Sequence, residues 1–158
     1  MGKYVLDTGV FRKLLTNYPR GGIYKSHWEQ IDAGLKNNEL VSVDECYEEL
    51  IRYYNEENED RKWLKDRKKY FAYPTTNESI FIKELFKNKK YQEMIHFKNI
   101  ISNAPSADPF VIAKAKCENA TVVTIEERKP NSSRMPTVCD DIGIRCISYE
   151  DFMSEYIR

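Results

Sequence analysis

The fold is decided by the stretch KYVLDTGVFRKLL, residues 3–15. Residues 4–6 form a short apolar run that predicts a buried strand, and the turn-forming Asp7-Thr8-Gly9 ends it. Apolar residues then recur with the period of a helix from Val10 to Leu15. A strand followed directly by a helix is the unit from which α/β domains are built.

The alternation of strands and helices continues along the chain. Further strands are predicted at residues 40–42, 71–73 (an edge strand), 120–125 and 144–147. Helices are predicted over residues 24–35, 43–54, 61–69 and 108–115, with one long or broken helical region over 77–101, a short helix around Val138 and a terminal helix from Tyr149. The strands lack alternating polarity, which is typical of parallel sheets covered on both faces. We therefore expect an α/β fold with a short, mainly parallel sheet flanked by helices.

Length and composition bound the class of protein. The chain has 158 residues, of which 41% are hydrophobic and 32% charged, and this fits a single domain spanning residues 1–158. Twenty-five basic and 25 acidic residues cancel, so any surface that binds phosphates must be local. No apolar stretch approaches the roughly 20 residues that a bilayer requires. The sequence predicts a soluble, cytoplasmic protein with no membrane segment.

The cysteines and histidines do not form a zinc motif. Cys46, Cys117, Cys139 and Cys146 include no C-x-x-C pair, and His27 and His96 are far from them in sequence. We expect reduced, mostly buried thiols.

Acidic residues follow the predicted strands. Asp7 ends the first strand, and Glu126 follows the strand at residues 120–125. Asp108 begins a helix that starts at the same edge of a parallel sheet, and the third helix carries Glu45, Glu48 and Glu49. Carboxylates gathered in this way repel one another unless a cation is present. Oxygen ligands without a His or Cys set favour Mg²⁺ or Mn²⁺ over Zn²⁺.

Each acidic residue also has a purely structural interpretation. Asp108 before Pro109 suits a helix N-cap, Asp7 suits a turn, and Glu126 suits an ordinary charged loop. On the third helix, a rotation of about 100° per residue places Glu48 and Glu49 on the two flanks of the core face and points Glu45 away from it. This geometry does not choose between the two flanks.

Four motifs in order resemble those of the PIN-domain nucleases. They are VLDTGVF (residues 5–11), VS (41–42) with EL (49–50) downstream, ADPFVIA (107–113) and VVTIE (122–126). The resemblance covers nearly the whole chain. It is strongest to a subfamily of bacterial and archaeal PIN-like proteins of the DUF4411 type, close to the VapC toxins, in which a polar loop and a P-x-x-C segment follow the fourth motif, as residues 136–139 do here.

The resemblance implies a PIN-like three-layer αβα fold and a metal-dependent endoribonuclease that uses Mg²⁺ or Mn²⁺. The metal-site carboxylates would be Asp7, Glu49, Asp108 and Glu126, with Glu49 preferred over Glu48 because the motif places its acid directly before an apolar residue. A small antitoxin partner and a homodimer are implied as well. Two positions depart from the family pattern: Gly9 replaces Asn or Ser, and Glu126 replaces Asp. They sustain the alternative of a catalytically degenerate module that binds RNA or protein.

An RNA substrate requires local cations and aromatic surfaces. The loop candidates are Arg128, Lys129 and Arg134. The helical candidates are Arg61, Lys62, Lys65, Arg67, Lys68, Lys69, Lys83, Lys87, Lys89 and Lys90, and the tyrosines able to stack on bases are Tyr53, Tyr54, Tyr70 and Tyr73. The helical cations also suit a solvated helix face.

Two other enzyme classes fit the sequence less well. A phosphoryl-transfer domain with Asp7 as nucleophile would need a second acid at position 9, as in HAD-type phosphatases, or an acidic pair on the first strand, as in receiver domains. A nucleotide-binding domain would need a glycine-rich phosphate loop after a strand, and the chain has none.

Overall fold

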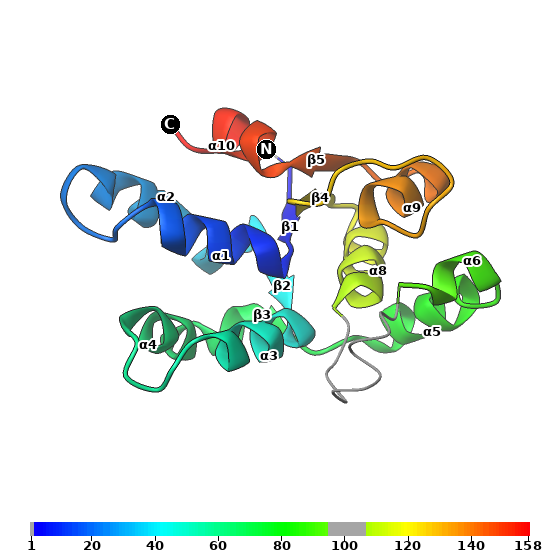
Figure 1. Ribbon diagram of the computed structural model, residues 1–158, viewed down its shortest axis with the longest axis horizontal. Coiled ribbons are helices and arrows are strands. Elements are labelled where there is room, and N and C mark those ends of the chain that lie inside the picture. The colour runs from blue at the N-terminus through cyan, green and yellow to red at the C-terminus, as the bar shows by residue number, and fades with distance from the viewer. Residues whose placement is uncertain (1, 95–106) are drawn as a thin grey trace.

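The computed structural model describes residues 2–94 and 107–158. At its centre is a five-stranded parallel sheet in the order β3-β2-β1-β4-β5 (Figure 1). The strands are β1 (Tyr4–Leu6), β2 (Leu40–Val43), β3 (Phe71–Ala72), β4 (Thr121–Thr124) and β5 (Cys146–Ser148). Every ladder between them is parallel, as the sequence predicts, and β3 is an edge strand.

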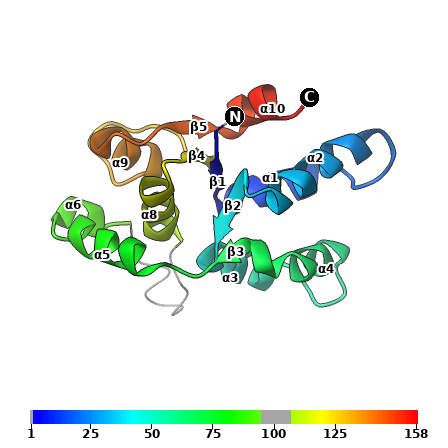
Figure 2. The same cartoon turned by 180° about the vertical axis from the view of Figure 1, so that it is seen from behind.

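Helices cover both faces of the sheet. Helix α1 (Thr8–Asn17) and helix α2 (Lys25–Lys36) lie on one side of β1, and helix α8 (Asp108–Glu118) lies on the other, as both views show (Figures 1 and 2). All residues of β1 and β2 are buried. Burial on both faces explains why the strands have no alternating polarity.

The remaining helices complete the PIN-like αβα arrangement. They are α3 (Asp44–Tyr53), α4 (Glu59–Asp66), α5 (Thr76–Leu85), α6 (Lys89–Gln92), α9 (Met135–Ile142) and α10 (Tyr149–Tyr156), with short 3-10 helices η1 (Gly22–Tyr24) and η2 (Lys68–Tyr70). The predicted helices and strands are confirmed in number and order up to residue 94 and from residue 107, apart from shifts of a few residues at their ends.

One helical prediction needs correction, and another leaves two alternatives open. The basic helix begins earlier than predicted, at Glu59, because the Asn58 side chain caps it by accepting a hydrogen bond from the Asp60 amide at 2.7 Å. The region predicted over residues 77–101 as one long or broken helix is broken, because Asn88 caps a second helix by accepting a hydrogen bond from the Lys90 amide. Residues 95–101 of that region, which include His96, lie outside the described residues.

The core extends over both faces of the sheet and into the helix layers. The rings of Trp28 on α2 and Trp63 on α4 meet edge to face at 5.2 Å between centroids, and Tyr4 on β1 packs edge to face on Phe152 of α10 at 5.4 Å. All four cysteines are free and all except Cys117 are buried, as expected. In the part of the chain that the structure describes, no helix has the length and apolarity needed to cross a membrane.

The register of the sheet aligns the carboxyl ends of its central strands. Leu6 on β1 pairs with Val123 on β4, and the Asp7 amide donates to the Val123 carbonyl at 3.1 Å. The Ser42 hydroxyl on β2 donates to the Leu6 carbonyl at 2.7 Å. The residues that follow β1, β2 and β4 therefore emerge at one edge of the sheet.

Candidate active site

Asp7 lies at the centre of that edge. It is the N-cap of α1, where its Oδ1 accepts a hydrogen bond from the Thr8 amide at 2.8 Å, and only 7% of its surface is exposed. The Thr124 hydroxyl at the end of β4 donates to Asp7 Oδ2 at 3.2 Å and accepts from the Glu126 amide at 3.1 Å. One threonine thus orients the Asp7 carboxylate and the chain that carries Glu126.

Glu49 comes from α3 and Asp108 from α8. Glu49 Oε1 accepts a hydrogen bond from the Ala107 amide at 3.0 Å, so the two helices meet where Asp108 begins α8. The capping role suggested for Asp108 is wrong: Ala107 occupies the cap position, and Asp108 is the first helical residue. Its side chain is therefore not engaged as an N-cap.

The rotation of α3 distinguishes its three glutamates. The Tyr47 ring packs on Phe71 of β3, and Glu49 lies close enough to Asp7 for its charge to raise the pKa of Asp7. Glu45 does not point away from the core as the helical wheel predicts, because it is 8% exposed and buried. A helical wheel gives angles around one helix, whereas burial depends on every element packed around that helix.

Glu126 is anchored from the loop that follows it. Its Oε2 accepts a hydrogen bond from the Met135 amide at 2.8 Å, at the first residue of α9. The first backbone amides of a helix have no partner within the helix and favour a carboxylate in this position. The bond closes the loop of residues 126–135 onto the edge of the sheet.

The charges of the other three carboxylates act on Asp7. The pKa of Asp7 is raised well above its ordinary value, first by burial and then by the charge of Asp108, with further contributions from Glu126 and Glu49. The Thr8 amide opposes the rise by donating to the carboxylate. The four residues predicted from the sequence thus lie close enough for the other three to disfavour the charge on Asp7.

The donor chemistry of this cluster suits a hard divalent cation. All four groups offer carboxylate oxygens, and a bound cation would relieve the repulsion that raises the Asp7 pKa. Among residues 2–94 and 107–158, however, no three His, Cys, Asp or Glu side chains stand in a ready-made metal-binding arrangement. Glu49 and Glu126 are instead directed to backbone amides.

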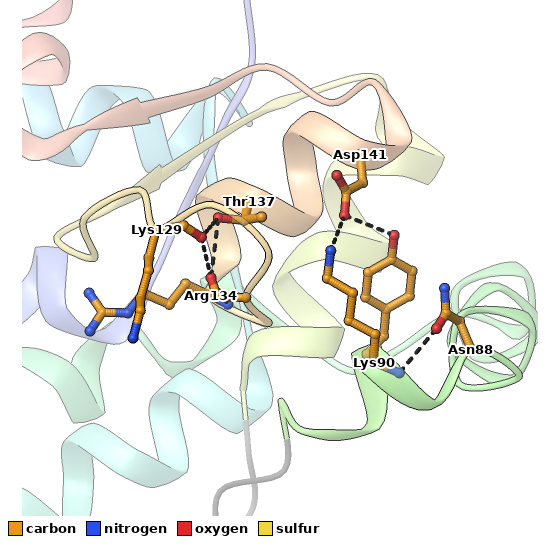
Figure 3. A network of polar contacts seen from close by, with 8 residues as sticks. Asn88, Lys90, Lys129, Arg134, Thr137 and Asp141 are labelled. Atoms are coloured by element: carbon orange, nitrogen blue, oxygen red, sulfur yellow. Dashed lines mark hydrogen bonds and ion pairs between the residues drawn. The ribbon is translucent and has the colours of Figure 1, made fainter.

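The loop cations predicted to contact RNA differ in their engagement. Arg128 forms an ion pair with Asp140 at 3.0 Å and donates to the Cys146 carbonyl at 2.9 Å, so it holds the loop against α9 and β5. The exposed side chains of Lys129 and Arg134 both extend away from α9 and from the Lys90–Asp141 ion pair (Figure 3). Among the residues that the structure describes, neither Lys129 nor Arg134 forms an ion pair that would anchor it as Asp140 anchors Arg128.

Several other predicted nucleic-acid contacts have structural roles. Arg61 donates to the carbonyls of Ile51 and Tyr54, and Arg67 makes a bidentate pair with Asp32 at 2.7 and 3.0 Å. Tyr54 is buried, which removes it as a stacking surface, whereas Tyr53 is 58% exposed. Sequence reasoning missed Arg12, whose guanidinium lies 3.9 Å above the Tyr53 ring. No local signal marks this pair, because its members lie on different helices.

Comparisons with known proteins agree with this architecture. A family model described as a domain of unknown function, DUF4411, matches residues 4–156. Two solved structures are similar over almost their whole length: VapBC2 from Rickettsia felis bound to a DNA fragment from its promoter, and FitAcB from Neisseria gonorrhoeae. Each shares 15% sequence identity with this chain at a TM-score of 0.53. The match to VapBC2 covers 92% of this chain and 97% of that one, and the match to FitAcB covers 93% of this chain and 98% of that one. A search of curated sequences gives no match.

Proposed function

Because this chain belongs to the DUF4411 family and has the PIN-like fold of VapC-type toxins, we propose that it is a metal-dependent endoribonuclease formed by one domain over residues 1–158. The observation that carries the proposal is the convergence of Glu49, Asp108 and Glu126 on the buried carboxylate of Asp7. Three half-buried carboxylates gathered around the buried Asp7 are destabilising by themselves. This arrangement is best explained by a cationic ligand and by the chemistry that such a ligand supports.

The mechanism assigns a role to each part of the cluster. Asp7 and Asp108 would hold Mg²⁺ or Mn²⁺, and Glu49 and Glu126 would complete the site directly or through water. When bound, the cation supplies positive charge to the phosphodiester and lowers the pKa of an attacking water. Thr124 holds the Asp7 carboxylate in one orientation. The Ala107 and Met135 amides hold the two glutamates at the rim of the cluster.

We also propose that the protein is the cytoplasmic toxin of a toxin–antitoxin pair, with a small antitoxin as partner and a homodimer as its assembly. Support comes from the two similar structures, which are complexes named VapBC and FitAcB. Co-expression with the product of the adjacent reading frame, followed by light scattering, tests both associations.

A second candidate is a PIN-like module that has lost turnover. Two observations favour it: the backbone amides already bind Glu49 and Glu126, and the side chain of Ile125 occupies the space beside Gly9. Such a module would bind RNA or protein without holding a metal tightly. Direct titration with Mn²⁺ therefore separates the two candidates.

The decisive experiment measures cleavage of single-stranded and structured RNA in Mn²⁺, Mg²⁺ or EDTA. Asp7→Asn and Asp108→Asn are compared with wild type, and Asp66→Asn, an exposed residue at the end of α4, serves as the matched control. We expect EDTA-sensitive cutting in wild type and the control, with at least a hundredfold loss in both site variants. A folded wild type that neither cuts RNA nor binds Mn²⁺ would support the non-catalytic module instead.

A further inference from the structure

A groove of about 420 Å³ opens beside the carboxylate cluster. One wall is the outer face of α1, with Gly9, Arg12 and Asn17 along it, and the other elements contribute Tyr53 and Ile125. Gly9 is two residues after Asp7, and Ile125 directly precedes Glu126. The groove is therefore lined by close chain neighbours of two of the carboxylates.

Gly9 shapes the end of the groove nearest the cluster. A Cβ at this position would lie 2.6 Å from both Cγ1 and Cδ1 of Ile125, which is too close for two carbon atoms. The absence of a side chain lets Ile125 lie against α1 while 49% of its surface stays exposed. The departure of position 9 from the family pattern thus creates an apolar floor next to the site.

The opposite end of the groove carries an aromatic ring and a cation. Tyr53 is 58% exposed, and the Arg12 guanidinium lies 3.9 Å above its ring centroid. The charge of Lys13 is neutralised by an ion pair with Glu150 at 2.8 Å. None of the ion pairs between residues that the structure describes includes Arg12. Its charge is therefore available to an anion.

We propose that this groove binds an unpaired ribonucleotide adjoining the scissile phosphate, with its base on Tyr53 and Ile125 and its phosphate on Arg12. The inference rests on the proposed function, because the scissile phosphate must occupy the carboxylate site. Arg12 covers one face of the Tyr53 ring, and the part of the ring that stays exposed offers the kind of aromatic surface on which unstacked bases bind. A base-paired nucleotide offers its edges rather than its face, so the groove selects single-stranded substrate.

The test measures RNA binding separately from cleavage. Binding of a short fluorescein-labelled single-stranded RNA of mixed sequence is followed by anisotropy in EDTA, and cleavage of the same RNA is followed in Mn²⁺. Tyr53→Leu and Arg12→Gln are compared with Tyr53→Phe, which keeps the ring, and with Ile23→Ala, which removes an 84% exposed apolar side chain outside the groove. Circular dichroism checks that all four variants are folded.

We expect Tyr53→Leu to weaken binding about five- to 150-fold and to raise KM more than it lowers kcat, because base stacking is lost. Tyr53→Phe and Ile23→Ala should bind RNA within twofold of wild type. Arg12→Gln should weaken binding and make it less dependent on salt, because a phosphate contact is lost.

The outcomes separate this inference from the proposed function. If wild type cleaves RNA and both Tyr53→Leu and Arg12→Gln keep its RNA affinity and KM, the groove does not bind the nucleotide. The proposed nuclease activity would still stand. Ring-dependent binding without cleavage would overturn the nuclease and, with it, the placement of the nucleotide beside a scissile phosphate, and would leave only a groove that binds RNA. Absence of RNA binding by wild type overturns the groove. Variants that lose a co-expressed protein partner but keep RNA binding would likewise overturn it, and would assign the groove to that partner.

Discussion

Glu45 offers a quantitative test of how burial and charge act in this fold. Its Oε1 is buried and has no hydrogen-bond partner among the described residues. Burial is the main cause that raises its pKa to about 7, and the nearby charges of Asp44, Glu78 and Glu48 raise it further, against a hydrogen bond from its own backbone amide. The folded protein thus binds a proton at Glu45 more tightly than the unfolded chain does.

The sign and size of the effect follow from proton linkage. Because the pKa is raised on folding, this contribution to stability is fully present below about pH 4.5 and is lost as the pH rises through 7. A rise from 4.5 to about 7 corresponds to about 3 kcal/mol of unfolding free energy, most of which is lost between pH 5 and pH 8. Glu45→Gln keeps the shape of the side chain and removes the charge.

We therefore expect Glu45→Gln to stabilise the protein at pH 8 relative to pH 5 by roughly 2 to 3 kcal/mol. Urea unfolding of wild type and variant at both pH values measures this difference directly. Glu56→Gln, at an exposed position after α3, is the matched control and should show no such difference. Equal effects of Glu45→Gln at pH 5 and pH 8 would refute the reasoning, since they would mean that Glu45 keeps an ordinary pKa.

Three further variants test other parts of the structure. Asp7→Asn should raise the Tm of the metal-free protein at pH 8, because the raised pKa of Asp7 means that its charged form is unfavourable in the folded state. In a thermal-shift assay the same variant should show a smaller increase in Tm on addition of Mn²⁺ than wild type does. Lys114→Met should lower the free energy of unfolding in urea by about 3 to 5 kcal/mol, because the buried Glu78, with 3% of its side chain exposed, loses the cation 3.9 Å away. A decrease below about 1 kcal/mol would contradict this expectation. Gly34→Ala should cost about 1 to 3 kcal/mol, because a Cβ there would collide with the Tyr156 hydroxyl, and an unchanged Tm would show that the ring moves freely.

Local patterns were sufficient to predict most of the architecture. The apolar runs at Tyr4–Leu6 and Thr121–Thr124 and the periodic helices after them depend on neighbouring residues, so they can be recognised without tertiary information. Parallel strands also place their carboxyl ends at one edge, which predicts that Asp7 and Glu126 are neighbours. The cap of a new helix at Asn88 and the helix start at Glu59 were missed, because short capping signals are weaker than hydrophobic periodicity.

The sequence by itself determined the alternation of elements and which acidic residues follow which strands, because both are properties of contiguous residues. Only the tertiary structure decided that Glu49 faces Asp7, that Glu45 is buried, and that Arg12 stacks on Tyr53. These features depend on how each helix rotates when it packs on the sheet and on its neighbours. That rotation is set by contacts between residues far apart in the chain, and no local pattern records it.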